Sequence, residues 1–124
     1  MMNYKLPKSE RLHAQKSIKE LFNEGSSFFL YPFKVLYLPK KQEGETIQVL
    51  FSVSKKKIKK AVDRNLIKRR MKEAYRLNKH SLTISESGLH IGLIYVASEP
   101  IDFATISKKF VSILQQISTQ VSEH

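Results

Sequence analysis

The chain has 124 residues, 41% of them hydrophobic and 10% aromatic, and it carries a net charge of +11 without a single cysteine. This composition predicts one folded domain over residues 1–124, and it excludes a disulfide framework and thiol catalysis. No apolar run approaches the roughly 18 residues that cross a bilayer, and the N-terminus lacks the apolar stretch of a signal peptide. We therefore expect a cytoplasmic protein with no membrane partner.

Apolar residues at helical spacing predict a first helix over residues 14–24. Alternating apolar residues then predict two strands, over residues 28–38 and 46–54, and Pro32 confines the early part of the first strand to an edge, a bulge or a strand start. The polar segment KKQEGE between them predicts a turn. The two strands are therefore expected to pair as an antiparallel hairpin.

The second half of the chain predicts a long basic helix over residues 58–78, a polar loop (NKHSLTISESG), and a strand over residues 89–98. This strand is apolar on both alternations, as expected of a central strand covered on both faces. Asp102 can cap a last helix over residues 103–120. The expected order is α-β-β-α-β-α, which predicts an α+β sandwich with helices packed on a mostly antiparallel sheet.

The positive charge is concentrated in and around the basic helix. Residues 55–79 contain 12 basic and two acidic side chains, a net charge of +10, whereas the rest of the chain has 10 basic and nine acidic side chains. A field concentrated in this way is typical of proteins that bind a polyanion.

The basic helix has two different faces at about 100° per residue. A cationic arc about 140° wide contains Arg64, Asn65, Lys68, Arg69, Lys72 and Arg76. A neighbouring apolar arc that can pack on the sheet contains Ile67, Met71, Ala74 and Tyr75. Arginine can grip two phosphate oxygens at once and lysine supplies a mobile charge, so the cationic arc indicates phosphate binding.

Five more lysines stand just before this helix: Lys55, Lys56, Lys57, Lys59 and Lys60. Backbone amides at the helix N-terminus also attract anions, which reinforces the positive field. The alternative is a solvated helix whose charges serve only solubility. We favour binding, because solubility requires neither arginine and asparagine on the arc nor near-neutrality in the rest of the chain.

The segment SVSKK followed by AVDRNLIKRRMKEAYR resembles the signature of the bacterial ribonuclease P protein component. That family has a pattern close to Arg-Asn-Arg-x-x-Lys-Arg after a strand that ends in Ser/Ala-Lys-Lys. Upstream, ERLHAQKSIKELFNEG is similar to the family's opening segment and first helix. The resemblance spans roughly residues 9–118. The chain departs from the pattern at Leu66, where the family often has a second arginine.

The resemblance implies an accessory role in an RNA-catalysed reaction. In that family the RNA subunit removes the 5′ leader from precursor tRNA, and the protein binds this catalytic RNA, holds the single-stranded leader in a cleft between the sheet and the first helix, and helps the complex retain Mg²⁺. The partners are then the catalytic RNA and precursor tRNA, with no obligate protein partner. We expect no catalytic or metal-binding residue in the chain itself, and Mg²⁺ only through the RNA complex.

Several residues of the chain match the family's motif. Arg64, Asn65, Lys68 and Arg69 match its core, and Lys55 and Lys56 match the lysine pair at the strand end. Together with their basic neighbours, these residues make up the predicted RNA-binding set: Lys55, Lys56, Lys57, Lys60, Arg64, Asn65, Lys68, Arg69, Lys72 and Arg76. Phe22 and Tyr37 are the candidates to line the leader cleft, because aromatic rings stack on unpaired bases. For Phe22 taken by itself, the favoured alternative is a place in the core.

Other function classes have less support in the sequence. A stand-alone nuclease needs clustered carboxylates or a positioned histidine pair, whereas the four histidines are scattered and each is expected at the surface or in a loop. The best rival is a structural, ribosomal-type RNA-binding protein, which shares the charge and the small α+β fold but has no leader cleft. A basic membrane-surface module ranks last, because the sheet is the better place for the helix's apolar face.

Overall fold

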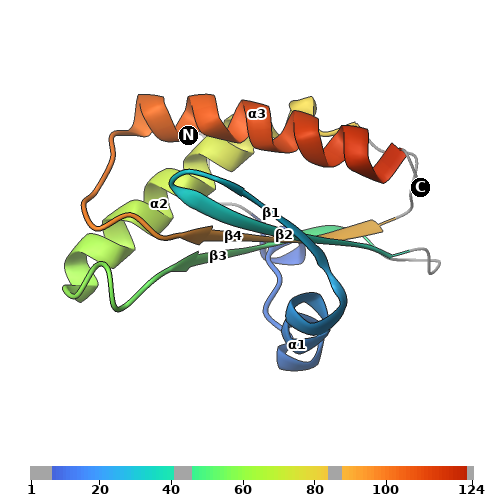
Figure 1. Cartoon of the computed structure of the whole chain (residues 1–124), viewed down its shortest axis with the longest axis horizontal. Coiled ribbons are helices and arrows are strands. Elements are labelled where there is room, and N and C mark those ends of the chain that lie inside the picture. Colours follow the sequence, from blue (N-terminus) through green and yellow to red (C-terminus); the bar gives the residue numbers. More distant parts are fainter. Residues whose placement is uncertain (1–6, 41–45, 84–87, 123–124) are drawn as a thin grey trace.

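The structure, a computed structural model, describes residues 7–40, 46–83 and 88–122 (Figure 1). Its α-helices are α1 (Gln15–Glu24), α2 (Ala61–Asn78) and α3 (Phe103–Ser122), its strands are β1 (Ser26–Leu30), β2 (Phe33–Lys40), β3 (Ile47–Val53) and β4 (Gly88–Tyr95), and two short 3-10 helices are η1 (Lys8–Glu10) and η2 (Lys79–Ser81). Most of the expected turn KKQEGE and part of the expected loop after the basic helix lie outside the described residues.

The four strands form one mixed sheet with the order β1-β2-β4-β3. β2 is antiparallel to both β1 and β4, whereas β3 and β4 are parallel. The predicted antiparallel hairpin between residues 28–38 and 46–54 is therefore wrong, because β4 lies between β2 and β3. Parallel neighbours require a long crossover connection, and α2 is that crossover. The α+β class is confirmed.

The segment predicted as one strand over residues 28–38 is two strands joined by a tight turn. β1 ends at Leu30, Tyr31 and Pro32 form the turn around a cis peptide bond, and β2 begins at Phe33. Proline has no N–H to donate to a sheet and its ring fixes φ, so it suits a turn better than a strand interior. The element order thus contains one strand more than predicted, α-β-β-β-α-β-α.

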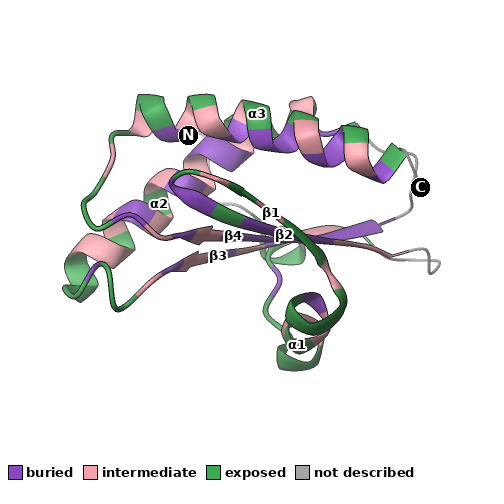
Figure 2. Ribbon diagram, viewed as in Figure 1, coloured by how far each residue is buried: buried purple, intermediate pink, exposed green. Residues whose placement is uncertain are grey.

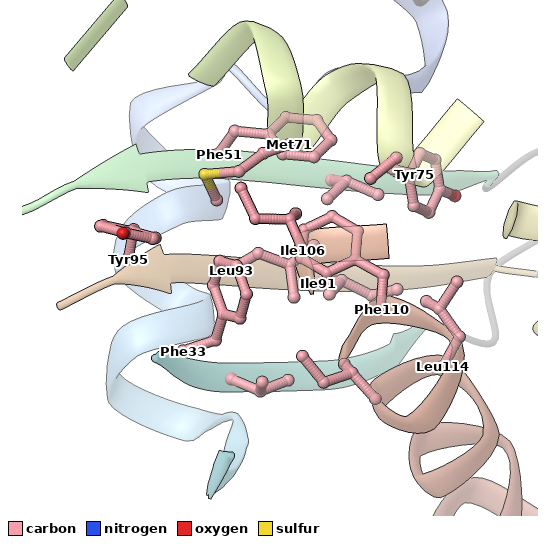
Figure 3. Close-up of a cluster of buried hydrophobic side chains, with 14 of the residues drawn as sticks. Phe33, Phe51, Met71, Tyr75, Ile91, Leu93, Tyr95, Ile106, Phe110 and Leu114 are labelled. Atoms are coloured by element: carbon pink, nitrogen blue, oxygen red, sulfur yellow. The ribbon is translucent and has the colours of Figure 1, made fainter. Parts of the chain in front are cut away.

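Helices cover both faces of the sheet, α2 and α3 on one side and α1 on the other (Figure 1). The main core lies under α2 and α3, where the Phe33 ring is 5.0 Å from that of Phe110 and 5.6 Å from that of Tyr95 between ring centroids (Figure 3). A smaller core under α1 consists of Leu12, Leu21 and Leu36. β4 is the buried central strand that the sequence predicts. The helix α1 and the strand β1 expose more of their residues than the other helices and strands do (Figure 2).

The ends of α1 and α3 and the position of His90 can be compared with the predictions from the sequence. The Thr105 amide donates to the Asp102 carboxylate at 2.9 Å, which confirms the predicted cap of α3. Gly25 ends α1 in an extended conformation, and its hydrogen atom avoids a clash, because a Cβ there would lie 2.5 Å from the Leu21 carbonyl oxygen. His90, expected at the surface or in a loop, is instead buried in β4, which is covered on both faces.

Candidate nucleic-acid interface

The helix α2 is docked by the four apolar side chains that the sequence singles out. Ile67, Met71, Ala74 and Tyr75 are all buried, and the Tyr75 ring packs 5.9 Å from the ring of Phe51 on β3. Burial raises the pKa of the Tyr75 hydroxyl well above its usual value. The apolar arc therefore faces the sheet, as predicted.

Polar contacts on one flank of α2 attach it to α3 and the segment before it. Arg70 Nη1 donates to the Ile101 carbonyl oxygen at 2.8 Å, and Asn78 Nδ2 donates to the Ser107 hydroxyl at 2.7 Å. Arg70 therefore braces the segment before α3. Because this flank meets α3, the opposite flank, which carries the cationic arc, faces the β3 edge of the sheet.

The side chains of the cationic arc differ in how freely they can meet a ligand. Asn65 and Arg69 are exposed, whereas the other four are half-buried. Arg76 is paired with Glu73 across one helical turn, at 2.6 Å between Nη2 and Oε1. The two exposed side chains are thus the best placed for direct contact, and Arg76 reaches a phosphate only in competition with Glu73.

The loop of residues 54–60, called the lysine loop below, lies between β3 and α2. Lys55, Lys56, Lys57 and Lys60 are all exposed there, while Ile58 anchors the loop in the core with 4% of its surface exposed. Arg64 Nη1 donates to the carbonyl oxygens of Ile58 at 2.9 Å and Lys59 at 2.7 Å. The arc and the loop therefore form one continuous basic surface.

Arg11 enlarges this surface from a distant part of the sequence. The Leu12 amide donates to the Val49 carbonyl oxygen at 3.0 Å, and Arg11 bridges to Val49, so the N-terminal segment extends the β3 edge. Burial lowers the pKa of the Lys72 ammonium, and repulsion from Arg11 and then Lys68 lowers it further. Three cations thus crowd together beside α2. No local pattern in the sequence indicates that Arg11 joins them.

Phe22 and Tyr37, predicted to line one cleft, lie on opposite sides of the sheet. Phe22 is 48% exposed on α1, whereas Tyr37 is 4% exposed and its hydroxyl donates to the Gln120 side chain on α3. Tyr37 is therefore a core residue and the expectation that it joins Phe22 is wrong. The alternation already contained a signal for this, because Tyr37 shares its register with the buried Phe33 and Val35.

No group of three or more His, Cys, Asp or Glu side chains that could hold a metal ion occurs among residues 7–40, 46–83 and 88–122. The same residues include no helix long and apolar enough to cross a membrane.

Comparison with known proteins gives a consistent family assignment. The family model described as Ribonuclease P matches residues 6–118. The ribonuclease P protein component of Porphyromonas gingivalis is 38% identical over 121 residues, which cover 94% of this chain and 88% of that protein. The component from Geobacter sp. is 36% identical over 124 residues, covering 98% of this chain and 90% of that protein.

Solved structures agree. The ribonuclease P protein of Thermotoga maritima superposes with a TM-score of 0.70 at 28% identity, covering 86% of this chain and 96% of that one. The Staphylococcus aureus protein gives a TM-score of 0.72 at 23% identity, covering 90% of this chain and 96% of that one, and so supports the fold alone.

Proposed function

The chain belongs to the ribonuclease P protein family, and we propose that it binds the catalytic RNA of ribonuclease P through the cationic arc and the lysine loop. As a protein component of ribonuclease P it acts in tRNA processing. This family assignment does not favour the structural, ribosomal-type alternative. The observation that carries the proposal is that the lysines of the loop, Asn65 and Arg69 are all exposed, while the hydrogen bonds of Arg64 join the loop to the helix.

In this proposal the RNA subunit carries out the hydrolysis and the protein supplies charge and position. Folded RNA brings phosphates close together, and their repulsion must be screened before substrate binds. Arg69 and the lysine loop screen phosphates at fixed places, so less Mg²⁺ is needed in solution. In this proposal the RNA holds the Mg²⁺ of the reaction, and the side chains of this protein take no part in the bond cleavage.

The 5′ leader of precursor tRNA is proposed to lie on the sheet face that carries α1. Phe22 is exposed on this helix. Next to α1, Lys34 is exposed and Ile94 and Ser52 are half-buried. An exposed ring can stack on an unpaired base, and an exposed lysine can bind the leader's backbone. Tyr37 is not part of this surface.

The proposal is tested by adding the protein to a bacterial ribonuclease P RNA and following cleavage of precursor tRNA at low Mg²⁺. The wild-type protein is expected to restore efficient cleavage. A variant with Arg64, Lys68 and Arg69 replaced by glutamine is expected to need a far higher protein concentration. The matched control replaces Lys108 and Lys109 on α3 by glutamine. It removes positive charge from a part of the protein outside the cationic arc and the lysine loop. Equal loss in both variants, or no stimulation by folded wild-type protein, contradicts the proposal.

The cellular setting belongs to the same proposal. A chain with no cysteine suits a reducing compartment, and we place the protein in the cytoplasm with precursor tRNA as its substrate partner and no obligate protein partner. Fractionation of cells that produce a tagged chain tests this placement. Recovery of the protein outside the compartment that contains ribonuclease P RNA contradicts it.

A further inference from the structure

Two aromatic side chains at the tip of the β1–β2 hairpin are exposed to solvent. Phe29 and Tyr31 each expose 59% of their surface, and their ring centroids are 6.4 Å apart at an interplanar angle of 58°. Their neighbours on the same strand, Phe28 and Leu30, pack against the main core. The fold is therefore built without Phe29 and Tyr31, which leaves the faces of two rings available.

The strand register shows which face of the sheet Phe29 occupies. Phe29 pairs with Lys34, Lys34 with Ile94, and Ile94 with Ser52, so these residues form one row across all four strands. Paired residues on neighbouring strands project to the same side of a sheet. The adjacent row contains Leu36, which is buried together with Leu21 of α1. The row of Phe29 is thus on the α1 face.

α1 covers the adjacent row and leaves the row of Phe29 more open. The Leu21 side chain lies over Gly92 and Leu36, where a Cβ on Gly92 would be 3.2 Å from Leu21 Cδ2. Lys34, in contrast, is exposed and Ile94 is only half-buried. An open row, with a pair of exposed rings at its outer end, therefore runs beside α1 at the end of the sheet.

The other end of this row leads to the lysine loop. The Ser54 amide donates to the Tyr95 carbonyl oxygen at 3.1 Å, and the Val96 amide donates to the Pro32 carbonyl oxygen at 2.9 Å. These bonds hold the hairpin tip and the start of the lysine loop at one end of the sheet, as the ribbon also shows (Figure 1). With strands about 4.8 Å apart, three spacings put about 14 Å between β1 and β3.

The charge along this path favours a nucleic acid. Lys34 lies in the middle of the row, and Lys55, Lys56 and Lys57 are exposed beyond its end. Glu99 is an exposed carboxylate on the loop after β4 at the same end of the sheet. Its single negative charge is outnumbered by the four lysines, Lys34, Lys55, Lys56 and Lys57. Aromatic rings combined with a basic track are how proteins bind unpaired strands, and a four-stranded sheet can stack two or three bases.

We propose that Phe29 and Tyr31 form a base-stacking site for unpaired nucleotides of the 5′ leader, at the far end of a path that crosses the sheet from the lysine loop. This inference rests on the proposed function. The site sets how much of a leader the protein can hold, because a leader too short to cross the sheet does not reach the rings.

The test compares leader lengths in the reconstituted holoenzyme. Precursor tRNAs with one unpaired leader nucleotide and with about ten are titrated with wild-type enzyme and with the double variant F29A/Y31A. The variant is expected to lose about fivefold or more in affinity for the long-leader substrate, the fold-change that corresponds to the lower end of base–aromatic stacking. Affinity for the short-leader substrate and for the catalytic RNA is expected to stay unchanged.

A second double variant, F29L/Y31L, separates stacking from apolar docking. It keeps apolar side chains and removes the rings, so a stacking site loses long-leader affinity as F29A/Y31A does. Unchanged long-leader affinity in either variant overturns the inference. So does a loss of self-association, seen by sedimentation, without a loss of leader affinity, because the rings then serve a second copy of the chain.

The wild-type data show which proposal has failed. If the wild-type holoenzyme does not distinguish long from short leaders, leader binding on the α1 face fails, and this inference fails with it. If the wild type prefers long leaders and both variants match it, only the stacking site fails. Thermal melting of both variants verifies the fold, which the exposure of both side chains leaves intact.

Discussion

The Arg64 guanidinium donates to the carbonyl oxygen of Lys59 at 2.7 Å. This contact, with a second one to Ile58 at 2.9 Å, makes the first arginine of α2 a brace for the lysine loop as well as a cation of the interface. Both bonds come from Nη1, and the planar guanidinium holds these N–H groups in a fixed direction, whereas lysine carries the same charge on a shorter, freely rotating ammonium group.

Replacing Arg64 is therefore expected to loosen the lysine loop. In the R64K variant, hydrogen exchange at residues 54–60 is expected to accelerate and catalytic-RNA affinity to fall almost as far as in R64A, although the charge is retained. Hydrogen bonds from a charged group at a partly exposed site predict about 1 kcal/mol of lost stability. In the control K57A, loop exchange stays at the wild-type rate. A fully active R64K would show that only charge matters here.

The interface is expected to show a strong dependence on salt. If about six cations neutralise phosphates, log affinity falls against log salt with a slope of roughly −4 to −5. The K68Q/R69Q variant is expected to have a slope shallower by nearly two, whereas K108Q/K109Q keeps the wild-type slope. Fluorescence anisotropy with labelled ribonuclease P RNA measures the affinity of each protein at several salt concentrations. Equal slopes in all three proteins would show that Lys68 and Arg69 of the cationic arc do not neutralise RNA phosphates.

Lys72 is expected to weaken the fold and strengthen RNA binding. Burial, and then repulsion from Arg11 and Lys68, lowers its pKa, so the folded protein holds this proton less tightly than the unfolded chain. At neutral pH both states are protonated and the destabilisation is constant; as pH rises through the lowered pKa, the proton leaves the folded state and stability increases.

The K72M variant is accordingly expected to melt at a higher temperature than wild type at pH 7 and low salt, and to bind the catalytic RNA less tightly. The difference in melting temperature is expected to shrink as the pH is raised into the range where Lys72 deprotonates. Calorimetric melts at several pH values measure it. A lower melting temperature for both K72M and K72Q at pH 7 would mean that an attractive contact outweighs the repulsion.

Gly25 is expected to resist substitution. A Cβ there would lie 2.5 Å from the Leu21 carbonyl oxygen and 3.1 Å from that of Tyr37, and backbone atoms cannot move aside as a side chain can. G25A is expected to cost about 1–3 kcal/mol in chemical denaturation. G92A is the control, because its tightest neighbour is a movable Leu21 methyl group at 3.2 Å. A G25A variant as stable as wild type would rule out this steric role.

The local properties of the chain were determined by sequence alone. The apolar arc of α2, the cap at Asp102 and the double-sided burial of β4 follow from spacing and side-chain chemistry within a few turns or residues. The structure has all three, because a helix or strand presents its faces in the same way whatever it packs against. The concentration of charge around α2 is likewise a property of the sequence.

Only the tertiary structure decided which elements meet. Periodicity reports which side chains share a face, and so it groups Tyr37 with Phe33 and Val35. It carries no information on the neighbouring strand, so it could not predict that β4 lies between β2 and β3 or that α1 and Phe22 lie on the other side of the sheet from Tyr37. Arg11 joins Lys72 only because the N-terminal segment pairs with β3. Pairings between distant segments depend on the packing of the whole core, and that packing brings together the basic surface at the β3 edge.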